Sequence, residues 1–220
     1  MLKLLKAILP FMAIAMLFIF TGLALVLITD KFELHLAINQ QIGEPANSFF
    51  KYFTHVGDGL TAVVLIILVA LISKNKIANG LLGLSTLAIS SVITQLLKRQ
   101  VFADILRPSG YYQDNQLNLV EGVDLHTAFS FPSGHSTASF ALFIFIAFVF
   151  RKHRYIQLLC GICAVLAAYS RVHISQHFTE DIVFGAAIGI STFFLLYHFS
   201  TKIKYTAELE IEKEKSTVKV

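Results

Sequence analysis

The stretch Leu5–Thr29, LKAILPFMAIAMLFIFTGLALVLIT, decides the class of fold that this chain adopts. Lys6 is its only charged residue, and Lys3 lies just before it. A helix of about 20 apolar residues crosses the hydrocarbon core of a bilayer, and this run is longer than that. Its basic start is like that of a secretory signal, but no small-x-small cleavage site is evident near its end. We therefore predict a retained signal-anchor helix.

Five further apolar runs, each bounded by charged residues, follow the first. They lie at 58–73, 77–97, 134–150, 156–172 and 182–200. Charged residues make up 15% of the chain and hydrophobic residues 55%, whereas soluble domains carry about 25% charged residues. We predict an all-α integral membrane bundle of six transmembrane helices in residues 1–200. A polar cytoplasmic tail is predicted for residues 201–220.

The basic residues near the ends of the apolar runs predict the orientation of the bundle. In a six-span arrangement one side receives Lys3, Lys6, Lys74, Lys76, Arg151, Lys152, Arg154, Lys202 and Lys204. Cytoplasmic segments of membrane proteins are enriched in Lys and Arg. We predict a multi-pass protein of the cytoplasmic (inner) membrane with both termini in the cytoplasm. Segments 30–57, 98–133 and 173–181 would then face the periplasm or outside, with 30–57 as a short amphipathic helix along the membrane.

Four other cations flank the predicted outer ends of the helices: Lys98, Arg99, Arg107 and Arg171. They could be interfacial side chains that extend towards water, or they could bind an anion. The stretch KRQVFADILRP, residues 98–108, ends the third apolar run, and Pro108 favours extended backbone at Arg107. Two or three cations placed in this way could hold a phosphate group.

A second stretch, FPSGHST at residues 131–137, precedes the fourth apolar run. At a helix start, the backbone N–H groups of Ser133 and Gly134 would be unpaired and favourable to an anion. His135 beside them could give a proton to a leaving oxygen. Farther along, Gly185 and Gly189 form a G-x-x-x-G pattern, which we interpret as packing between helices of one chain.

The third stretch is SRVHISQHFTED at residues 170–181. His177 and Asp181 are four residues apart and would share a helical face, so that Asp181 can orient His177 as a nucleophile. An alternative uses His173, His177 and Asp181 as metal ligands. That alternative leaves Arg107 and Arg171 unexplained, because cations beside a metal ion would repel it.

Together and in this order, the three stretches resemble the signature of the type 2 phosphatidic acid phosphatase superfamily. The second matches Pro132-Ser133-Gly134-His135 completely, and the third matches Ser170, Arg171, His177 and Asp181. The superfamily has a lysine seven positions before Arg107, where this chain has Gln100. Lys98 lies two residues too early, and two residues turn a helix by about 200°. Lys98 therefore reaches the site only if the helix bulges or unwinds, and Arg99 is the substitute.

The resemblance implies a mechanism in two steps that needs no metal and no cofactor. His177 attacks phosphorus and forms a phosphohistidine, Asp181 orients it, and His135 gives a proton to the leaving oxygen. The phosphoryl oxygens are held by Lys98, Arg107, Arg171 and the backbone amides of Ser133 and Gly134.

The predicted substrate is a phosphomonoester or diphosphate of a membrane lipid. Candidates are undecaprenyl diphosphate, phosphatidylglycerol phosphate, phosphatidic acid and lipid A. The predicted partners are this lipid and the bilayer, with no nucleic acid and no obligate protein partner inferred. A lipid phosphotransferase would use the same residues. A transporter or channel would instead need polar residues through the middle of the spans, which are nearly free of charge.

Overall fold

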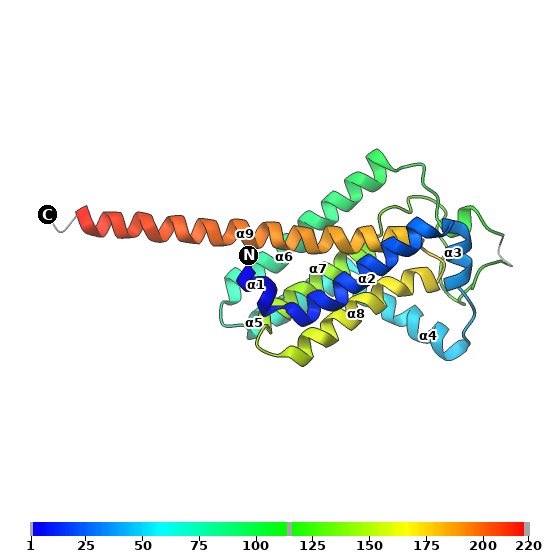
Figure 1. Ribbon diagram of the computed structural model, residues 1–220, viewed down its shortest axis with the longest axis horizontal. Coiled ribbons are helices and arrows are strands. Elements are labelled where there is room, and N and C mark those ends of the chain that lie inside the picture. Colours follow the sequence, from blue (N-terminus) through cyan, green and yellow to red (C-terminus); the bar gives the residue numbers. More distant parts are fainter. Residues whose placement is uncertain (1, 114–115, 218–220) are drawn as a thin grey trace.

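The computed structural model describes the backbone of residues 2–113 and 116–217 and the side chains up to residue 202. Its described residues form helices, turns and loops without a β-strand. The principal helices, shown in Figure 1, are α1 (Leu2–Ala7), α2 (Leu9–Ile28), α3 (Lys31–Ile38), α4 (Glu44–Phe53), α5 (Gly59–Ile72), α6 (Lys76–Leu96), α7 (Gly134–Val149), α8 (Arg154–His173) and α9 (Thr179–Thr217). The all-α class predicted from the sequence is confirmed.

Four helical segments of the described chain are long and apolar enough to cross a membrane: Leu9–Ile28, Lys76–Val101, Arg154–His173 and Thr179–Lys202. A fifth span is possible if α4 and α5, whose axes differ by 64°, count as one broken span. The predicted fourth run forms α7, which has only 16 residues. At a rise of 1.5 Å per residue, such a helix is about 24 Å long, less than a bilayer core of ~30 Å. The chain is thus a multi-pass helical membrane protein, with four or five spans by length.

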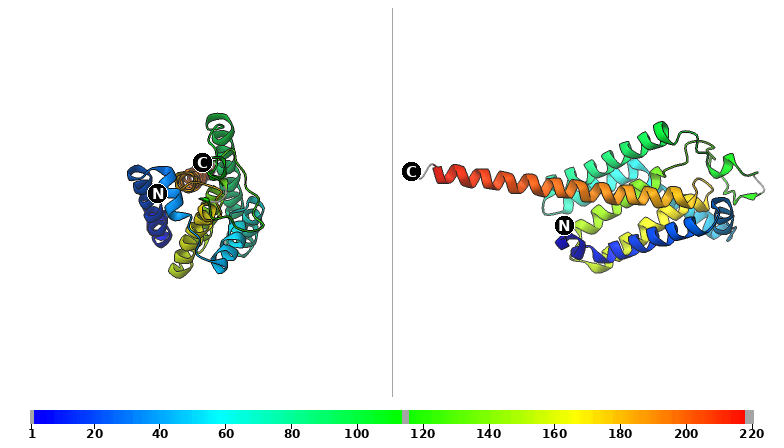
Figure 2. Two further views of the ribbon diagram at one scale, coloured as in Figure 1. Left: turned by 90° about the vertical axis from the view of Figure 1, so that its right-hand side faces the viewer. Right: turned by 45° about the horizontal axis from the view of Figure 1, so that its top comes forward.

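Helix α7 packs against α5, α6, α8 and α9, and α2 in turn packs against α8 and α9 (Figure 2). Most of the side chains of α7 are buried, including the fully buried Phe140 and Phe145. Beyond its polar first turns, from Phe140 onward, this helix is apolar around its whole circumference, as expected for one enclosed by other helices. Its N-terminal end therefore has a fixed position relative to the helices around it.

Helix α9 approaches α7 closely because two glycines lie between them. A Cβ atom on Gly189 would lie 2.6 Å from the Thr137 carbonyl oxygen and 3.0 Å from the Ala141 nitrogen. A Cβ atom on Gly185 would lie 2.5 Å from the Ser133 carbonyl oxygen. The interpretation of the G-x-x-x-G pattern as packing within one chain is confirmed.

The two ends of the bundle differ in character (Figure 1). One end carries the N-terminus and the α5–α6 and α7–α8 turns, where the basic residues of the short connections lie. The other end carries α3, α4 and the long segment 102–133. The predicted amphipathic helix in 30–57 was wrong in detail, because the segment forms two helices and a 3-10 turn at Thr54–Gly57. Gly43, at a φ of 97°, is the backbone position that separates α3 from α4.

The predicted polar tail continues the last helix. The backbone of α9 remains helical to Thr217 and extends beyond the bundle, as Figure 1 shows. Residues 218–220 lie outside the described part of the chain. Whether the tail is a separate cytoplasmic segment stays a prediction.

The α7–α9 contact can be tested with a methyl group. We expect Gly189→Ala to lower the thermal unfolding temperature in detergent and to reduce activity, because the new Cβ meets backbone atoms of α7. Overpacking of this kind destabilises by about 1–3 kcal/mol. Gly80→Ala on α6 is the matched control, since its Cβ would lie 3.5 Å from the nearest atom, an ordinary contact. Equal unfolding temperatures for the two variants would contradict the packing described here.

Candidate active site

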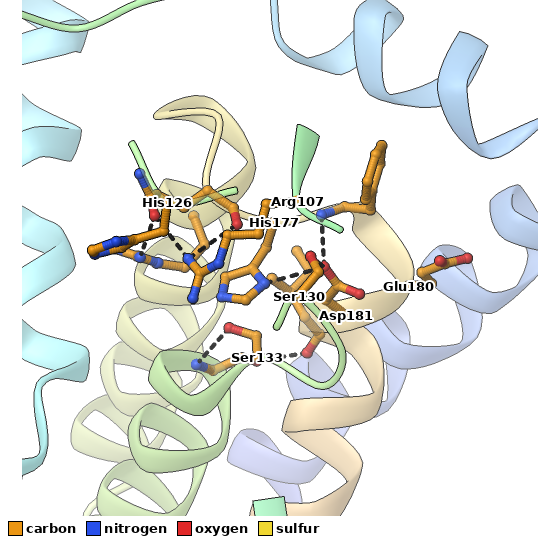
Figure 3. Close-up of polar contacts among 12 residues, drawn as sticks. Arg107, His126, Ser130, Ser133, His177, Glu180 and Asp181 are labelled. Carbon is orange, nitrogen blue, oxygen red and sulfur yellow. Dashed lines mark hydrogen bonds and ion pairs between the residues drawn. The ribbon is translucent and has the colours of Figure 1, made fainter. Parts of the chain in front are cut away.

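A buried histidine and aspartate form the centre of the polar end of the bundle (Figure 3). His177 Nδ1 lies 3.1 Å from Asp181 Oδ2, and both side chains are at most 1% exposed. The same carboxylate oxygen accepts hydrogen bonds from Ser130 Oγ at 2.5 Å and from the Phe178 N–H at 2.9 Å. With Nδ1 turned to Asp181, the Nε2 atom lies on the opposite edge of the imidazole ring. The predicted His177–Asp181 pair is present.

The backbone between α8 and α9 fixes this geometry. Helix α8 ends at His173, and the N–H groups of Gln176 and His177 both donate to the Arg171 carbonyl oxygen, at 2.9 and 3.0 Å. Ser175 adopts a φ of 56°, in the left-handed region, which turns the chain after α8. Asp181 then falls in the first turn of α9, where a negative charge is favourable.

Two arginines from distant segments share one glutamine. Arg107 donates from a terminal nitrogen to Gln176 Oε1 at 2.7 Å and from Nε to the Ala128 carbonyl oxygen at 3.0 Å. Arg171 donates to Thr54 Oγ1 at 2.9 Å and reaches the same Gln176 oxygen at 3.5 Å. The Nε–H of Arg171 is buried and has no hydrogen-bond partner within the described chain. Such a donor can bind an oxygen of a ligand.

Lys98 reaches the site because the end of α6 changes its winding. Residues Leu97–Val101 form a π-helical turn, a feature often found at functional sites. Lys98 is 7% exposed, whereas Arg99 is exposed and donates to Gln95 Oε1 at 3.4 Å. The bulge that the sequence required for Lys98 is therefore present. Arg99 lies at the edge of the site.

The environment of His177 favours its neutral form. Burial lowers its pKa well below the ordinary value, and the positive charges of Arg107, Lys98 and Arg171, with His135 nearby, act in the same direction. Burial also lowers the pKa of Arg107. The residues predicted from three separate stretches thus surround one imidazole, and this environment favours its neutral form.

The start of α7 is held by Ser133. Its Oγ accepts a hydrogen bond from the Ser136 N–H at 3.4 Å, and its own N–H donates to the Asp181 carbonyl oxygen at 3.0 Å. The predicted use of the Ser133 amide for phosphate is therefore corrected, because that amide already joins α7 to α9. Gly134 remains the residue whose amide begins the helix.

His135 has a partner that the sequence did not suggest. Its Nε2 lies 2.8 Å from Asp58 Oδ1, and the other carboxylate oxygen lies 2.8 Å from His55 Nδ1. Asp58, Thr54 and Gln176 were all missed by the sequence analysis. A usable signal existed for Asp58, since an acidic residue at the end of an apolar run is as unusual as the arginines that drew attention.

The alternative metal site is not formed. His173 Nε2 lies 2.9 Å from Asn47 Oδ1, in a buried cluster with Asn118 and away from Asp181. Among the residues described, no group of three or more His, Cys, Asp or Glu side chains is arranged to hold a metal ion. His173 therefore joins α8 to α4, and the three residues of the alternative ligand set are not brought together.

A cavity of about 410 Å³ opens beside these cations. It has no acidic lining residue and is bordered by Gln95, Lys98, Arg99, Arg107, His126, Thr127, Ala128 and Phe129. Its basic lining is suited to an anionic group.

The helical membrane fold combines a buried histidine–aspartate pair with buried cations, an arrangement suited to an enzyme that acts on phosphate groups. The model of the PAP2 superfamily matches residues 79–205, more than half of the chain, and the chain belongs to this superfamily. It is a membrane lipid phosphatase, as the resemblance implied.

Named relatives agree with this family. Phosphatidylglycerophosphatase B of Bacillus subtilis is 29% identical over 168 residues, which cover 72% of this chain and 77% of that enzyme. The lipid A 4'-phosphatase of Bacteroides thetaiotaomicron is 37% identical over 82 residues, covering 37% of this chain and 35% of that enzyme.

Two solved structures share the fold. Aquifex aeolicus LpxE aligns with a TM-score of 0.67 and 23% identity over 77% of this chain and 96% of that one. The transmembrane PAP2-type phosphatidylglycerolphosphate phosphatase of Bacillus subtilis aligns with a TM-score of 0.63 and 24% identity, over 92% of this chain and 98% of that one.

The placement of Lys98 in the site can be tested by comparing a variant of Lys98 with a variant of the neighbouring Arg99. We expect Lys98→Gln to weaken inhibition by orthovanadate, a phosphate analogue, by about tenfold or more, because a buried charge-assisted contact is lost. Arg99→Gln should change the inhibition constant by less than about threefold, since exposed ion pairs contribute little. The measurement is the vanadate inhibition constant of the two purified variants. A larger effect of Arg99→Gln would contradict the assignment of Lys98 as the cation inside the site.

Proposed function

We propose that this phosphatase transfers the lipid phosphoryl group to Nε2 of His177 and then hydrolyses the phosphohistidine. The observation that carries the proposal is the buried His177, held by Asp181 through Nδ1 and surrounded by Arg107, Lys98 and Arg171. A neutral imidazole oriented by a carboxylate is an activated nucleophile. Cations fixed around the reacting group stabilise the charge that develops on the phosphoryl oxygens.

Each residue has a defined role in the two steps. The bond from His177 Nε2 to phosphorus forms as the bond from phosphorus to the lipid oxygen breaks, and His135 gives that oxygen its proton. Neutral His135 then accepts a proton from the water that attacks the phosphohistidine. Arg107, Lys98, the unpartnered Nε–H of Arg171 and the Gly134 amide hold the phosphoryl oxygens.

The same proposal includes the topology. We place the site at the outer (periplasmic) face of the cytoplasmic membrane, with both termini in the cytoplasm. The positive-inside rule supports this, because the basic turns lie at the end of the bundle opposite to the site. A count of six spans requires α5 and the short α7 each to cross the membrane separately. The short α7 can do so if the site at its outer end is recessed below the membrane surface.

We propose phosphatidylglycerol phosphate as the first substrate to test. The relative named phosphatidylglycerophosphatase B aligns over 72% of this chain, whereas the alignment with the lipid A 4'-phosphatase covers 37%. Undecaprenyl diphosphate, phosphatidic acid and lipid A complete the panel. Transfer of the phosphate to a second lipid would use the same phosphohistidine, so an acceptor lipid belongs in the same assay.

The test is phosphate release by purified protein in detergent, without divalent metal. We expect His177→Ala to release phosphate from none of these lipids while the protein remains folded in detergent. Removal of a nucleophile typically lowers the rate by several orders of magnitude. His153→Ala, in the exposed turn between α7 and α8, is the matched control and should keep full activity.

Two outcomes would contradict the proposal. Normal turnover by His177→Ala excludes His177 as the nucleophile. Phosphate recovered on the acceptor lipid rather than in solution would make the protein a phosphotransferase.

The protonation of His177 gives a further prediction. Because burial and neighbouring cations lower its pKa, the neutral form should persist as the pH falls below the usual histidine value of about 6.5. NMR titration of the ring signals lost in His177→Ala measures this directly. We expect a neutral ring at pH 6, and a titration midpoint at or above 6.5 would contradict the described environment.

A further inference from the structure

The bend between α4 and α5 brings a fourth stretch of the chain to the site. Residues Thr54–Asp58, THVGD, lie where the two helix axes change direction by 64°. The 3-10 turn in this stretch contacts both α7 and α8. It belongs to none of the three stretches from which the site was predicted.

The stretch lies against the start of α7 because Gly57 has no side chain. A Cβ atom there would lie 3.0 Å from the His135 carbonyl oxygen and 2.7 Å from Ser139 Oγ. On the other side, Thr54 Oγ1 accepts the hydrogen bond from Arg171. Asp58, which follows Gly57, is thereby placed beside the His135 ring.

The Asp58 carboxylate bridges two imidazoles. Oδ1 lies 2.8 Å from His135 Nε2, and Oδ2 lies 2.8 Å from Nδ1 of the exposed His55. Since each oxygen has its own partner, the carboxylate is fixed in plane and in direction. His135 Nε2 is thus engaged, and Nδ1 is the other ring nitrogen that can exchange a proton.

The charges around His135 are otherwise unfavourable to its protonated form. The groups that face it from the packed segments are Arg171 of α8, Arg107 of the long segment, His177 of the α8–α9 turn, and Asp58 with His55 of the bend. The carboxyl group of Asp181 on α9 is bonded instead to His177, Ser130 and Phe178. Asp58 is therefore the carboxylate that directly contacts His135.

We propose that Asp58 is a positioning residue that holds His135 and stabilises its imidazolium, so that His135 can protonate the leaving lipid oxygen. This inference rests on the proposed function. In the first step Nδ1–H passes to the lipid oxygen as the phosphorus–oxygen bond breaks, and Nε2–H stays bonded to Asp58. In the second step neutral Nδ1 takes a proton from the attacking water. The site then contains two carboxylate–histidine pairs, one for the nucleophile and one for the acid.

The test is Asp58→Asn, which preserves shape and removes charge. We measure release of the leaving group in a single turnover, which reports the first step alone. With a lipid alkyl phosphate, the rate should fall by about tenfold or more, because general acid catalysis contributes about 100-fold or more. With p-nitrophenyl phosphate it should fall by less than about threefold, because p-nitrophenolate leaves without a proton.

The pH profile supplies a second readout. Without the Asp58 charge the imidazolium is less stable, so the loss of activity at high pH should begin at lower pH in the variant. Asp58→Glu should restore part of the rate with the lipid. Asp104→Asn, an exposed carboxylate after α6, is the matched control and should behave as the wild type with both substrates.

Equal loss with both substrates, or no loss with either, overturns the inference. If Asp58→Asn lowers the unfolding temperature, Asp58→Ser replaces it, because it also removes the charge that contacts His135, and a selective loss with the lipid must still be seen. The outcomes are separate from those of the proposed function. Activity in His177→Ala removes the phosphohistidine mechanism, whereas an unselective Asp58→Asn removes only the role given to Asp58.

Discussion

The buried carboxylate of Asp181 is the constraint on which the rest of the site depends. Its Oδ2 atom is bonded to the His177 ring, the Ser130 hydroxyl and the Phe178 N–H, and its backbone carbonyl accepts the Ser133 N–H. A buried carboxylate is tolerated only when such partners are present. The requirement joins the start of α9, the start of α7 and the long segment before it. Gly185 and Gly189 let α7 and α9 come close enough for these bonds to form.

The cations of the site show a second constraint, because they are buried without enough anions to balance them. Arg107 and Arg171 share the neutral oxygen of Gln176, and Lys98 is buried beside them. Burying uncompensated charge is unfavourable, and ionisable residues near a membrane interior generally have a function. A phosphate group would supply the missing negative charge. Burial and the same cations lower the pKa of His177, so the groups that would bind the substrate also favour the neutral form of the proposed nucleophile.

Much of the fold and of the candidate site could be predicted from the sequence, because both the apolar runs and the polar stretches are local patterns. Apolar length identified a helical membrane bundle, and the spacing of His177 and Asp181 predicted their contact. The number of spans was less certain, because α7 is short and α5 forms a bent pair with α4. Lys98 needed a π-helical turn that spacing alone cannot reveal. Asp58 offered only the signal of an acidic residue at the end of an apolar run, and its contact with His135 depends on the tertiary fold. Gln176 became visible only when the fold placed it beside the arginines.

The central claim is that His177 becomes phosphorylated during turnover. Rapid acid-free quenching of the purified enzyme with lipid substrate, followed by proteolysis and mass spectrometry, tests it most directly. The account predicts a phosphate group on the peptide that contains His177, formed faster than the steady-state turnover and absent from His177→Ala. Phosphate found on another side chain, or turnover in His177→Ala at the wild-type rate, would contradict the account.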